Sequence, residues 1–467
     1  MQEKVVAKGP VHFIGIGGGG MSGLAEIALT LDYQVQGSDI KSSPMSQRLA
    51  VLGAKVSSEH GAEAIKGAGC VVYSSAIGPM NVELLEAQRL QLPLLHRSDF
   101  LAELLQSKTA ITVAGTHGKS TTAAMITHVL DDLGVQPWAA IGGEMLRYGS
   151  TARIGNGPLF VAEADESDGS FLKYRPFIGV LTNVELDHMD YFKTPEGLAD
   201  AFAVYLKHIH PDGRAVIGWD HKLSRQIGGA YNGPRLTFGT LIGSEVRATS
   251  ARTNLGRSEF TAMVERDRVS CSLPALGKHN IQNALCTLAV VRALELDVHK
   301  AAESLAGFAG VARRMAQVYA HDGIKIFDDY AHNPGKVAAC VQTLKQTWPE
   351  AALHVVFQPH RFSRLETMYE ATLDSLRTAD YVYIVPVYSA GETTTQDFSP
   401  RRLAQDLGQR FPIKTFACAE LADAARSVLR YLGSPAVVLT VGAGDVGCVA
   451  DQLKEALHEK EPRQDAQ

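Results

Sequence analysis

The sequence predicts an α/β protein of several domains, each built on a largely parallel sheet. Short apolar runs typical of buried strands alternate with segments of helical spacing along nearly the whole chain. Glycine-rich turns after residues 14, 114 and 441 each follow such a run and precede a helical segment. At 467 residues the chain is long enough for about three domains of ~150 residues.

Composition limits the classes of function. A net charge of -5 does not favour a nucleic-acid-binding surface, which would show as a strongly basic patch or tail. The cysteines lie far apart and include no C-x-x-C pair, so neither a zinc site nor a redox pair is expected. The first ten residues lack the apolar run of a signal peptide, and no segment has ~18 uninterrupted apolar residues. We therefore expect a cytoplasmic protein, without membrane contact, that acts on a small molecule.

The first segment begins with a predicted strand, Val11–Ile14, and a glycine turn. Gly15, Gly17 and Gly20 match G-x-G-x-x-G, the turn that brings a helix N-terminus close to a diphosphate. Asp39 follows the next strand-like run, where an acidic residue can bind a ribose hydroxyl. The spacing indicates a nucleotide site and leaves NAD, FAD and a UDP-sugar open. A turn needed only for close packing is the alternative.

The second segment opens with a phosphate-binding loop. A strand predicted over 109–114 leads into Gly115-Thr116-His117-Gly118-Lys119-Ser120-Thr121, and apolar residues at helical intervals follow. Backbone N–H groups and the helix N-terminus are suited to phosphate oxygens, Lys119 to the terminal phosphates and Ser120 to a magnesium ion. The standard pattern has an earlier glycine where this chain has Val113, so a glycine turn with a chance lysine is the alternative. The expected ligand is ATP or GTP.

Two groups of polar residues follow strands predicted in the same segment. One begins at Glu163, after a strand over 159–162, and the other ends near His188, after a strand over 178–182. The other members are Asp165, Glu166, Asp168, Asn183, Glu185, Asp187 and Asp190. Because open α/β sheets bind ligands at the carboxyl ends of their strands, the two groups predict a magnesium site beside the phosphate loop. Solvated loop acids, with His188 capping a turn, are the alternative.

The third segment starts near residue 313 and repeats the alternation of strands and helices. Strands are predicted over 324–327, 353–357, 381–385 and 436–441, and the last leads into a second G-x-G-x-x-G, Gly442 to Gly447. No acidic residue can follow this turn on a further strand before the chain ends. We therefore expect a tight strand-to-helix turn, or one wall of the active-site cleft, rather than another dinucleotide site.

Seven motifs, in order along almost the whole chain, resemble those of the Mur ligase family of peptidoglycan precursor synthesis. They are GIGGGGMSG from Gly15, GTHGKST from Gly115, EADESD from Glu163, TNVELDH from Thr182, GKHNIQNA from Gly277, DDYAHNP from Asp328 and FQPHRFSR from Phe357. The resemblance implies a UDP-sugar-binding Rossmann-like domain at 1–107 and a central ATP-binding phosphate-loop domain at 108–312. It also implies a C-terminal, amino-acid-binding Rossmann-like domain at 313–467.

Within the family, the motifs are most similar to the branch that joins L-alanine to UDP-N-acetylmuramate with ATP. The resemblance implies an acyl phosphate formed from the lactyl carboxylate, Mg2+ as cofactor, and a monomer or weak homodimer. The nearest alternative is the recycling ligase, which adds the L-alanyl-γ-D-glutamyl-diaminopimelate tripeptide to the same sugar nucleotide. An NAD-dependent oxidoreductase leaves the second segment unexplained. A nucleotide-binding module without turnover is disfavoured by the histidines and arginines of the third segment.

The resemblance also implies roles for individual residues. The expected catalytic residues are Lys119, His188, Arg361 and Arg364, with magnesium on Ser120, Glu163 and His188. Besides the phosphate loop, ATP is expected to contact His279, Asn280, Asn283, Arg314 and Asp329. The sugar nucleotide is expected at Gly15, Gly17, Gly18, Gly20, Met21, Ser22, Ser38, Asp39, Ser74, His96 and Arg97. The amino acid is expected at Tyr330, His332, His360, Arg361 and Arg364, since a guanidinium can bind a carboxylate through two hydrogen bonds.

Three positions depart from the pattern of the alanine-adding branch or bear on it. Ser120 replaces the commoner threonine and keeps the hydroxyl. The segment 330–334 lacks a glycine and a second histidine usual in that branch, which leaves L-alanine, glycine and L-serine open. Lys207 is the candidate counterpart of a carbamylated lysine in some relatives, although this branch is not expected to need one. For His360 and Arg361, a surface ion pair with acids such as Glu366 is the alternative.

Overall fold

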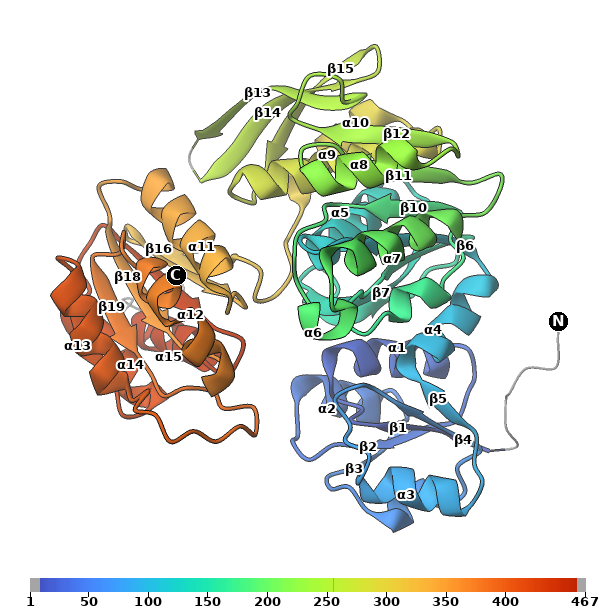
Figure 1. The fold of residues 1–467 in the computed structure, drawn as a ribbon, viewed down its shortest axis with the longest axis horizontal. Helices are drawn as coiled ribbons and strands as arrows, with labels where there is room; N and C mark the ends of the chain where they lie inside the picture. Colours follow the sequence, from blue (N-terminus) through green and yellow to red (C-terminus); the bar gives the residue numbers. More distant parts are fainter. Residues whose placement is uncertain (1–8, 255, 460–467) are drawn as a thin grey trace, which may run out of the picture. The chain divides into compact units, whose positions relative to one another are not determined.

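The structure, a computed structural model, describes residues 9–254 and 256–459, so expectations for the first eight and last eight residues lie outside it. The chain separates into two compact units, Met1–Val311 and Ala312–Gln467. The described strands form three sheets, two in the first unit and one in the second (Figure 1). The predicted α/β class is confirmed, whereas the exact domain boundaries at 107 and 312 stay predictions.

The first sheet is wholly parallel, in the order β3-β2-β1-β4-β5. Its strands are β1 Val11–Ile14, β2 Val35–Ser38, β3 Lys55–Ser57, β4 Cys70–Tyr73 and β5 Leu94–His96. Its helices are α1 Gly19–Thr30, α2 Pro44–Val51, α3 Val82–Arg89 and α4 Arg97–Gln106. Every residue of β1 is buried, as the continuous apolar run of a central parallel strand predicts.

Helix α1 packs against the second sheet as well as the first, because it contacts β7 and β8. Its residues from Met21 to Ala28 are all buried. Gly23 lies so close to this sheet that a β-carbon there would stand 3.2 Å from the backbone of Thr151. Ser150 donates a hydrogen bond of 2.6 Å to Glu26, which is also buried. This shared helix joins the two sheets into one unit.

The second sheet has ten strands, in the order β15-β14-β13-β12-β11-β10-β6-β9-β7-β8. They are β6 Thr109–Ala114, β7 Trp138–Met145, β8 Ser150–Arg153, β9 Leu159–Glu163, β10 Ile178–Leu181, β11 Arg214–Gly218, β12 Arg235–Gly239, β13 Val246–Asn254, β14 Arg257–Val264 and β15 Asp267–Leu273. Its helices are α5 Lys119–Asp132, α6 Met189–Phe192, α7 Pro195–Lys207, α8 Lys222–Ala230, α9 Lys278–Ala293 and α10 Val298–Ser304. Neighbouring strands in the row β13-β12-β11-β10-β6-β9-β7 are parallel. At one end of this row β8 pairs antiparallel with β7, and at the other end β14 pairs antiparallel with both β13 and β15.

Both faces of this sheet are covered. Ile111 and Val113 of β6 belong to the core formed with α5 and α9. Ala110 and Ala114, which point to the opposite face, belong to the core that includes Tyr205 of α7. The central strand therefore carries apolar residues on both faces and ends in the phosphate loop at the exposed edge of the sheet.

The second unit holds a sheet in the order β16-β17-β21-β18-β19-β20, parallel except for β16. Its strands are β16 Ala316–His321, β17 Ile324–Asp329, β18 Ala352–Phe357, β19 Tyr381–Ile384, β20 Lys414–Ala417 and β21 Ala436–Val441. Its helices are α11 Pro334–Thr347, α12 Phe362–Asp374, α13 Pro400–Arg410, α14 Leu421–Tyr431 and α15 Gly447–His458. Because β17 and β18 flank β21, the segments after these three strands emerge together at one edge of the sheet.

Within the described residues, no helix combines the length and the apolar character that crossing a bilayer requires. The six cysteines are free thiols, of which Cys448 alone is only partly buried.

Candidate active site

The phosphate loop depends on two glycines with left-handed backbone. Gly115 has φ of 128° and Gly118 has φ of 82°, a region that other residues adopt at a cost. A β-carbon at Gly115 would collide with the hydroxyl of Thr182, and one at Gly118 would stand 2.6 Å from Oδ1 of Asn283. The loop therefore lies directly against the end of β10 and the start of α9, which leaves no room for side chains at these two positions.

Lys119, predicted to stabilise the transferring phosphoryl group, is held inside the loop. Its Nζ lies 2.7 Å from Oε2 of Glu166 and donates a hydrogen bond of 2.8 Å to the carbonyl of Gly115. Burial alone would lower the pKa of Lys119, but Glu166 and Glu163 outweigh it and raise the pKa, so the amine is protonated at neutral pH. Glu166, which the sequence analysis placed in the acidic group of the predicted magnesium site, is the ionic partner of this lysine.

The residues predicted to bind magnesium lie around the same loop. The hydroxyl of Ser120 donates a hydrogen bond of 2.8 Å to Glu163, which also accepts one from the backbone of Gly142 at 2.9 Å. Nε2 of His188 stands 3.8 Å from Glu166. No set of three or more His, Cys, Asp or Glu side chains in the described chain is arranged around a metal position. A small number of protein ligands is enough for Mg2+, because this ion keeps several waters and binds phosphate oxygens.

A second carboxylate, Glu185, joins two histidines beside the loop. It lies 3.2 Å from Nε2 of His117 and 3.0 Å from Nδ1 of His221. Hydrogen bonds to these two imidazoles hold the pKa of Glu185 far below its usual range. Sequence reasoning missed His221, which precedes α8 and has no motif of its own.

The residues expected to contact the nucleotide from α9 have different surroundings. Asn283 lies beside Gly118 of the phosphate loop and donates to Asn280 at 3.1 Å. Asn280 is buried and donates to the carbonyl of Leu276 at 2.8 Å, so it fixes the start of the helix. His279 is exposed in the first turn. The structure thus brings Asn283 to the loop, while Asn280 has a structural role.

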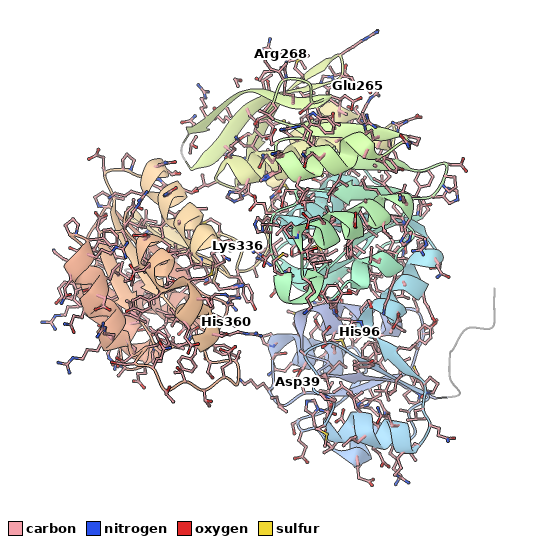
Figure 2. All side chains as sticks on the ribbon, viewed as in Figure 1. Asp39, His96, Glu265, Arg268, Lys336 and His360 are labelled. Carbon is pink, nitrogen blue, oxygen red and sulfur yellow. The ribbon has the colours of Figure 1, made fainter. Side chains whose placement is uncertain are left out.

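The glycine turn of the first sheet is closed by Asp39 (Figure 2). Its carboxylate accepts a hydrogen bond of 2.9 Å from the backbone of Gly17, in the turn that continues into α1. Arg97 lies over the first turn of the same helix, because a β-carbon at Gly20 would stand 3.0 Å from its Nη1. Met21 and Ser22 are buried instead, with the Ser22 hydroxyl 3.3 Å from that of Thr151. The backbone of the turn and Arg97 therefore remain the parts able to meet a diphosphate.

Ser38, which is predicted to contact the sugar nucleotide, lies inside the first domain. Its side chain is fully buried, and its hydroxyl donates to Glu83 at 2.7 Å and lies 2.8 Å from Nδ1 of His60. His12 contacts the same carboxylate at 3.0 Å. The alternation of β2 points this last side chain into the domain, which the sequence pattern could not distinguish from the ligand side. Ser74 directly follows β4, and the contacts described below are made by its neighbour Ser75.

In the second unit, Asp329 is the last residue of β17, and Tyr330 follows it. The buried Asp329 carboxylate accepts hydrogen bonds from the backbone of Met315 at 2.6 Å and of Ala331 at 2.7 Å. Burial raises the pKa of Asp329. The Arg314 guanidinium lies over the Tyr330 ring, 5.6 Å from its centre. Asp329 thus shapes the turn that carries the predicted amino-acid residues.

Four residues of the predicted amino-acid pocket lie together at this edge. The ring of His332 is 5.7 Å from that of Tyr330 and 5.4 Å from that of His360. Nη1 of Arg364 stands 3.0 Å from Nδ1 of His360. Burial, with Arg364 nearby, lowers the pKa of His332 to about 4, and burial with Arg364 and Arg361 also lowers that of His360. At neutral pH the group combines uncharged imidazoles with a cation, which suits a zwitterionic ligand.

Arg361 lies at the rim of this group. Its backbone has φ of 64°, and its side chain is 52% exposed, 4.0 Å from Glu392. The ion pair is therefore formed with Glu392, and Glu366 instead accepts a hydrogen bond from Thr394. Such exposure leaves the Arg361 guanidinium open to a ligand carboxylate.

The second glycine turn is filled by neighbouring side chains. Gln358 donates to Asp445 at 2.7 Å and accepts from the backbone of Val446 at 3.1 Å. Arg313 donates to the carbonyl of Gly442 at 2.6 Å. A β-carbon at Gly444 would collide with Gln358. The turn is therefore tightly packed, as predicted, and Asp445 also lines a cavity of about 810 Å³.

Lys207 occupies the last position of α7 and is exposed to solvent.

Three family models match successive parts of the chain. The model described as Mur ligase family, catalytic domain, matches residues 10–109, and that described as Mur ligase middle domain matches 113–291. The model described as Mur ligase, glutamate ligase domain, matches 313–444. Together they span both units.

Similar proteins extend over nearly the full length. The UDP-N-acetylmuramate–L-alanine ligase of Desulfotalea psychrophila is 37% identical over 452 residues, 96% of this chain and 98% of its own. That of Geobacter sulfurreducens is 38% identical over 440 residues, 93% of this chain and 95% of its own. The structure of the UDP-N-acetylmuramate-alanine ligase from Thermotoga maritima matches with a TM-score of 0.85 at 26% identity, over 97% of this chain and 100% of that one. The chain belongs to the Mur ligase family.

Proposed function

We propose that this chain joins L-alanine to the lactyl carboxylate of UDP-N-acetylmuramate and cleaves ATP to ADP and phosphate. The observation that carries the proposal is the 37% identity, over 96% of the chain, to a ligase of that name. The ion pair between Lys119 of the phosphate loop and Glu166 supports the proposal, since a loop used only as a turn does not require a buried, protonated lysine. We also propose that the enzyme works in the cytoplasm, where ATP is available, as a monomer or weak homodimer.

In the first step, a carboxylate oxygen of the sugar nucleotide attacks the γ-phosphorus of ATP, and ADP leaves. The product is an acyl phosphate. Both reactants are anionic, so catalysis depends on positioning and on neutralising charge. Lys119 supplies one positive charge at the loop. When bound, Mg2+ on Ser120 and Glu163, with a second ion on His188, would supply further charge to the phosphates.

In the second step, the amino group of L-alanine attacks the acyl carbon and phosphate leaves, which forms the amide. Arg364 and Arg361 are the residues we propose to bind the α-carboxylate of the amino acid. His332 and His360 carry lowered pKa values and stay uncharged, so they do not repel the ammonium form on arrival.

The test is phosphate release from ATP with magnesium and UDP-N-acetylmuramate, with one acceptor added at a time: L-alanine, glycine, L-serine or the L-alanyl-γ-D-glutamyl-diaminopimelate tripeptide. We expect release that requires both the sugar nucleotide and L-alanine, with slower release for glycine and L-serine. A one-methyl difference is worth only ~1 to 3 kcal/mol, so this preference is expected to be modest. Release only with the tripeptide would identify a recycling ligase, and none with any acceptor would overturn the proposal.

A further inference from the structure

The segment of residues 163–168, which begins at the last residue of β9, touches two parts of the first unit. Glu163 and Glu166 contact the phosphate loop, as described above. The two acids between and after them, Asp165 and Asp168, contact the first sheet instead. The sequence analysis interpreted all four carboxylates as a magnesium-binding group. Only Glu163 and Glu166 face the loop that would hold the ion.

Asp165 holds Arg97 at the glycine turn. Its Oδ2 accepts a hydrogen bond of 3.0 Å from Nη2 of Arg97, with both side chains at most one third exposed. Its Oδ1 accepts one from the backbone of Ser167 at 3.1 Å, which fixes the carboxylate. The opposite nitrogen, Nη1, stands against Gly20 in the first turn of α1. One end of the guanidinium is thus anchored while the other lies where a helix N-terminus favours an anion.

Asp168 holds a second residue, His96 at the end of β5. Its Oδ2 accepts a hydrogen bond of 2.6 Å from Ser75 and lies 3.7 Å from Nε2 of His96. His96 is labelled in Figure 2. Ser75 itself stands 3.2 Å from the same nitrogen. The backbone of Ser170 donates to Oδ1 at 3.0 Å. Burial opposes the charge of Asp168, but these hydrogen bonds outweigh it and lower the pKa, so a charged carboxylate orients the imidazole.

We infer that Asp165 and Asp168 are positioning residues for the sugar nucleotide, which act by holding Arg97 at the glycine turn and His96 at the end of β5. The inference rests on the proposed function, since it requires that the turn bind the diphosphate of UDP-N-acetylmuramate. Because the phosphate-loop acids lie on the same six-residue segment, one short stretch of chain sets the geometry of both nucleotide sites.

The test is the dissociation constant of UDP-N-acetylmuramate, and of UDP as a smaller probe, measured by calorimetry without ATP. Asp165→Asn and Asp168→Asn keep the shape of each side chain and remove its charge. We expect each to weaken binding about tenfold, the scale of a charge-assisted hydrogen bond that is partly exposed. The KM for the sugar nucleotide is expected to rise in parallel, with the KM for ATP within twofold of wild type. Asp165→Glu is expected to recover part of the affinity.

A double substitution separates positioning from simple stability. In an Arg97→Ala background, Asp165→Asn is expected to change the dissociation constant no further, because it acts through Arg97. Lys173→Met is the matched control, since it removes an ion pair of 2.6 Å with Asp99 without changing Arg97 or Asp165. It is expected to leave binding unchanged.

The outcomes distinguish the two proposals. Wild-type affinity in both Asp165→Asn and Asp168→Asn, with tight binding by the wild type, would overturn the inference and leave the function standing. An equal loss for Lys173→Met, or a further loss in the Arg97→Ala background, would also overturn it by assigning the effect to general stability. Failure of the wild type to bind either UDP compound would overturn the proposed function, and the inference with it.

Discussion

Two glycine turns in this chain share a local form and differ in what surrounds them. The phosphate loop joins β6 to α5, and the turn of residues 442–447 joins β21 to α15. In the first, Lys119 and Ser120 meet carboxylates from a neighbouring strand end. In the second, the side chains of Gln358 and Arg313 satisfy backbone groups of the turn itself.

The difference teaches that glycine spacing predicts a strand-turn-helix geometry and not its use. A turn that binds a phosphate must leave backbone N–H groups available and supply positive charge. The phosphate loop carries its own lysine and hydroxyl directly after Gly118. Helix α15 begins instead with Gly447 and Cys448, which supply no positive charge, and the carbonyl of Gly442 accepts a hydrogen bond from the Arg313 guanidinium.

The largest expected effect is that of removing the cation from the phosphate loop. Lys119→Ala is expected to lower ATP-dependent phosphate release by about 10³-fold or more, since charge stabilisation dominates phosphoryl transfer. Lys300→Ala, which replaces an exposed lysine of α10, is the control and is expected to keep wild-type rates. A Lys119→Ala enzyme with half the wild-type rate would contradict the claim that the first turn, unlike the second, acts on phosphate through its own lysine.

The second unit is expected to lose stability in mild acid. His354, fully buried on β18, stacks against Tyr381 with ring centres 4.2 Å apart, and burial lowers its pKa to about 4. The unfolded chain has a pKa near 6.5 and binds a proton first, so stability falls as the pH drops from 6.5 to 4. The loss is up to about 3 kcal/mol.

This pH effect is measured in the full chain by hydrogen exchange of the amides of β18 and β21. Faster exchange is expected at pH 4.5 than at pH 7 after correction for intrinsic rates. His354→Phe keeps an aromatic ring and is expected to reduce the slope without abolishing it, because His332 in the same unit also has a pKa lowered to about 4. An unchanged slope in that variant would assign the effect to other groups.

Exchanging glycines tests the two turns against each other. Gly115→Ala is expected to lower the kcat/KM for ATP by about 10²-fold, because the β-carbon collides with Thr182 and the backbone angle is strained. Gly444→Ala is expected to destabilise the second unit by about 1 to 3 kcal/mol through overpacking against Gln358. Direct titration with an ATP analogue checks that Gly444→Ala keeps nucleotide affinity, and a loss there would contradict the division of roles.

The smallest effect is expected from the side chain that fills the C-terminal turn. Gln358→Ala removes hydrogen bonds to Asp445 and Val446, which is expected to cost about 1 kcal/mol of unfolding free energy. The KM for L-alanine is expected to rise a few-fold, because His360 lies two residues further on. Gln317→Ala, at an exposed position of β16, is the control. Equal KM values for L-alanine in both variants would show that the turn does not affect the amino-acid pocket.

Much of this molecule could be predicted from local sequence. The strands 109–114 and 436–441 were predicted at the positions where they occur, since continuous apolar runs between turn residues are strong signals. The contact of Ser120 with Glu163 could also be predicted, because the two residues lie at or just after the ends of neighbouring strands. These features depend on patterns of a few residues or on one sheet edge.

Other contacts depend on where distant elements pack. Glu166 was recognised as acidic, yet its pairing with Lys119 requires the turn after β9 to fold back onto the loop. His221 reaches Glu185 from the position before α8, in a segment that carries no motif. The inward direction of the Ser38 hydroxyl depends on the buried Glu83, 45 positions further along the chain. None of these can be read from spacing, because tertiary packing decides them.

Helix α1 limits how this protein can be recombined with its relatives. A chimera that exchanged only residues 10–109 would place one parent's α1 against the other parent's β7 and β8, where Gly23 leaves no room for a larger residue. Within that surface, Ser150 must also find an acceptor such as Glu26. Transfer of sugar-nucleotide preference between family members would therefore have to include the β7–β8 hairpin. The practical unit of exchange is a packed surface, although it is discontinuous in the chain.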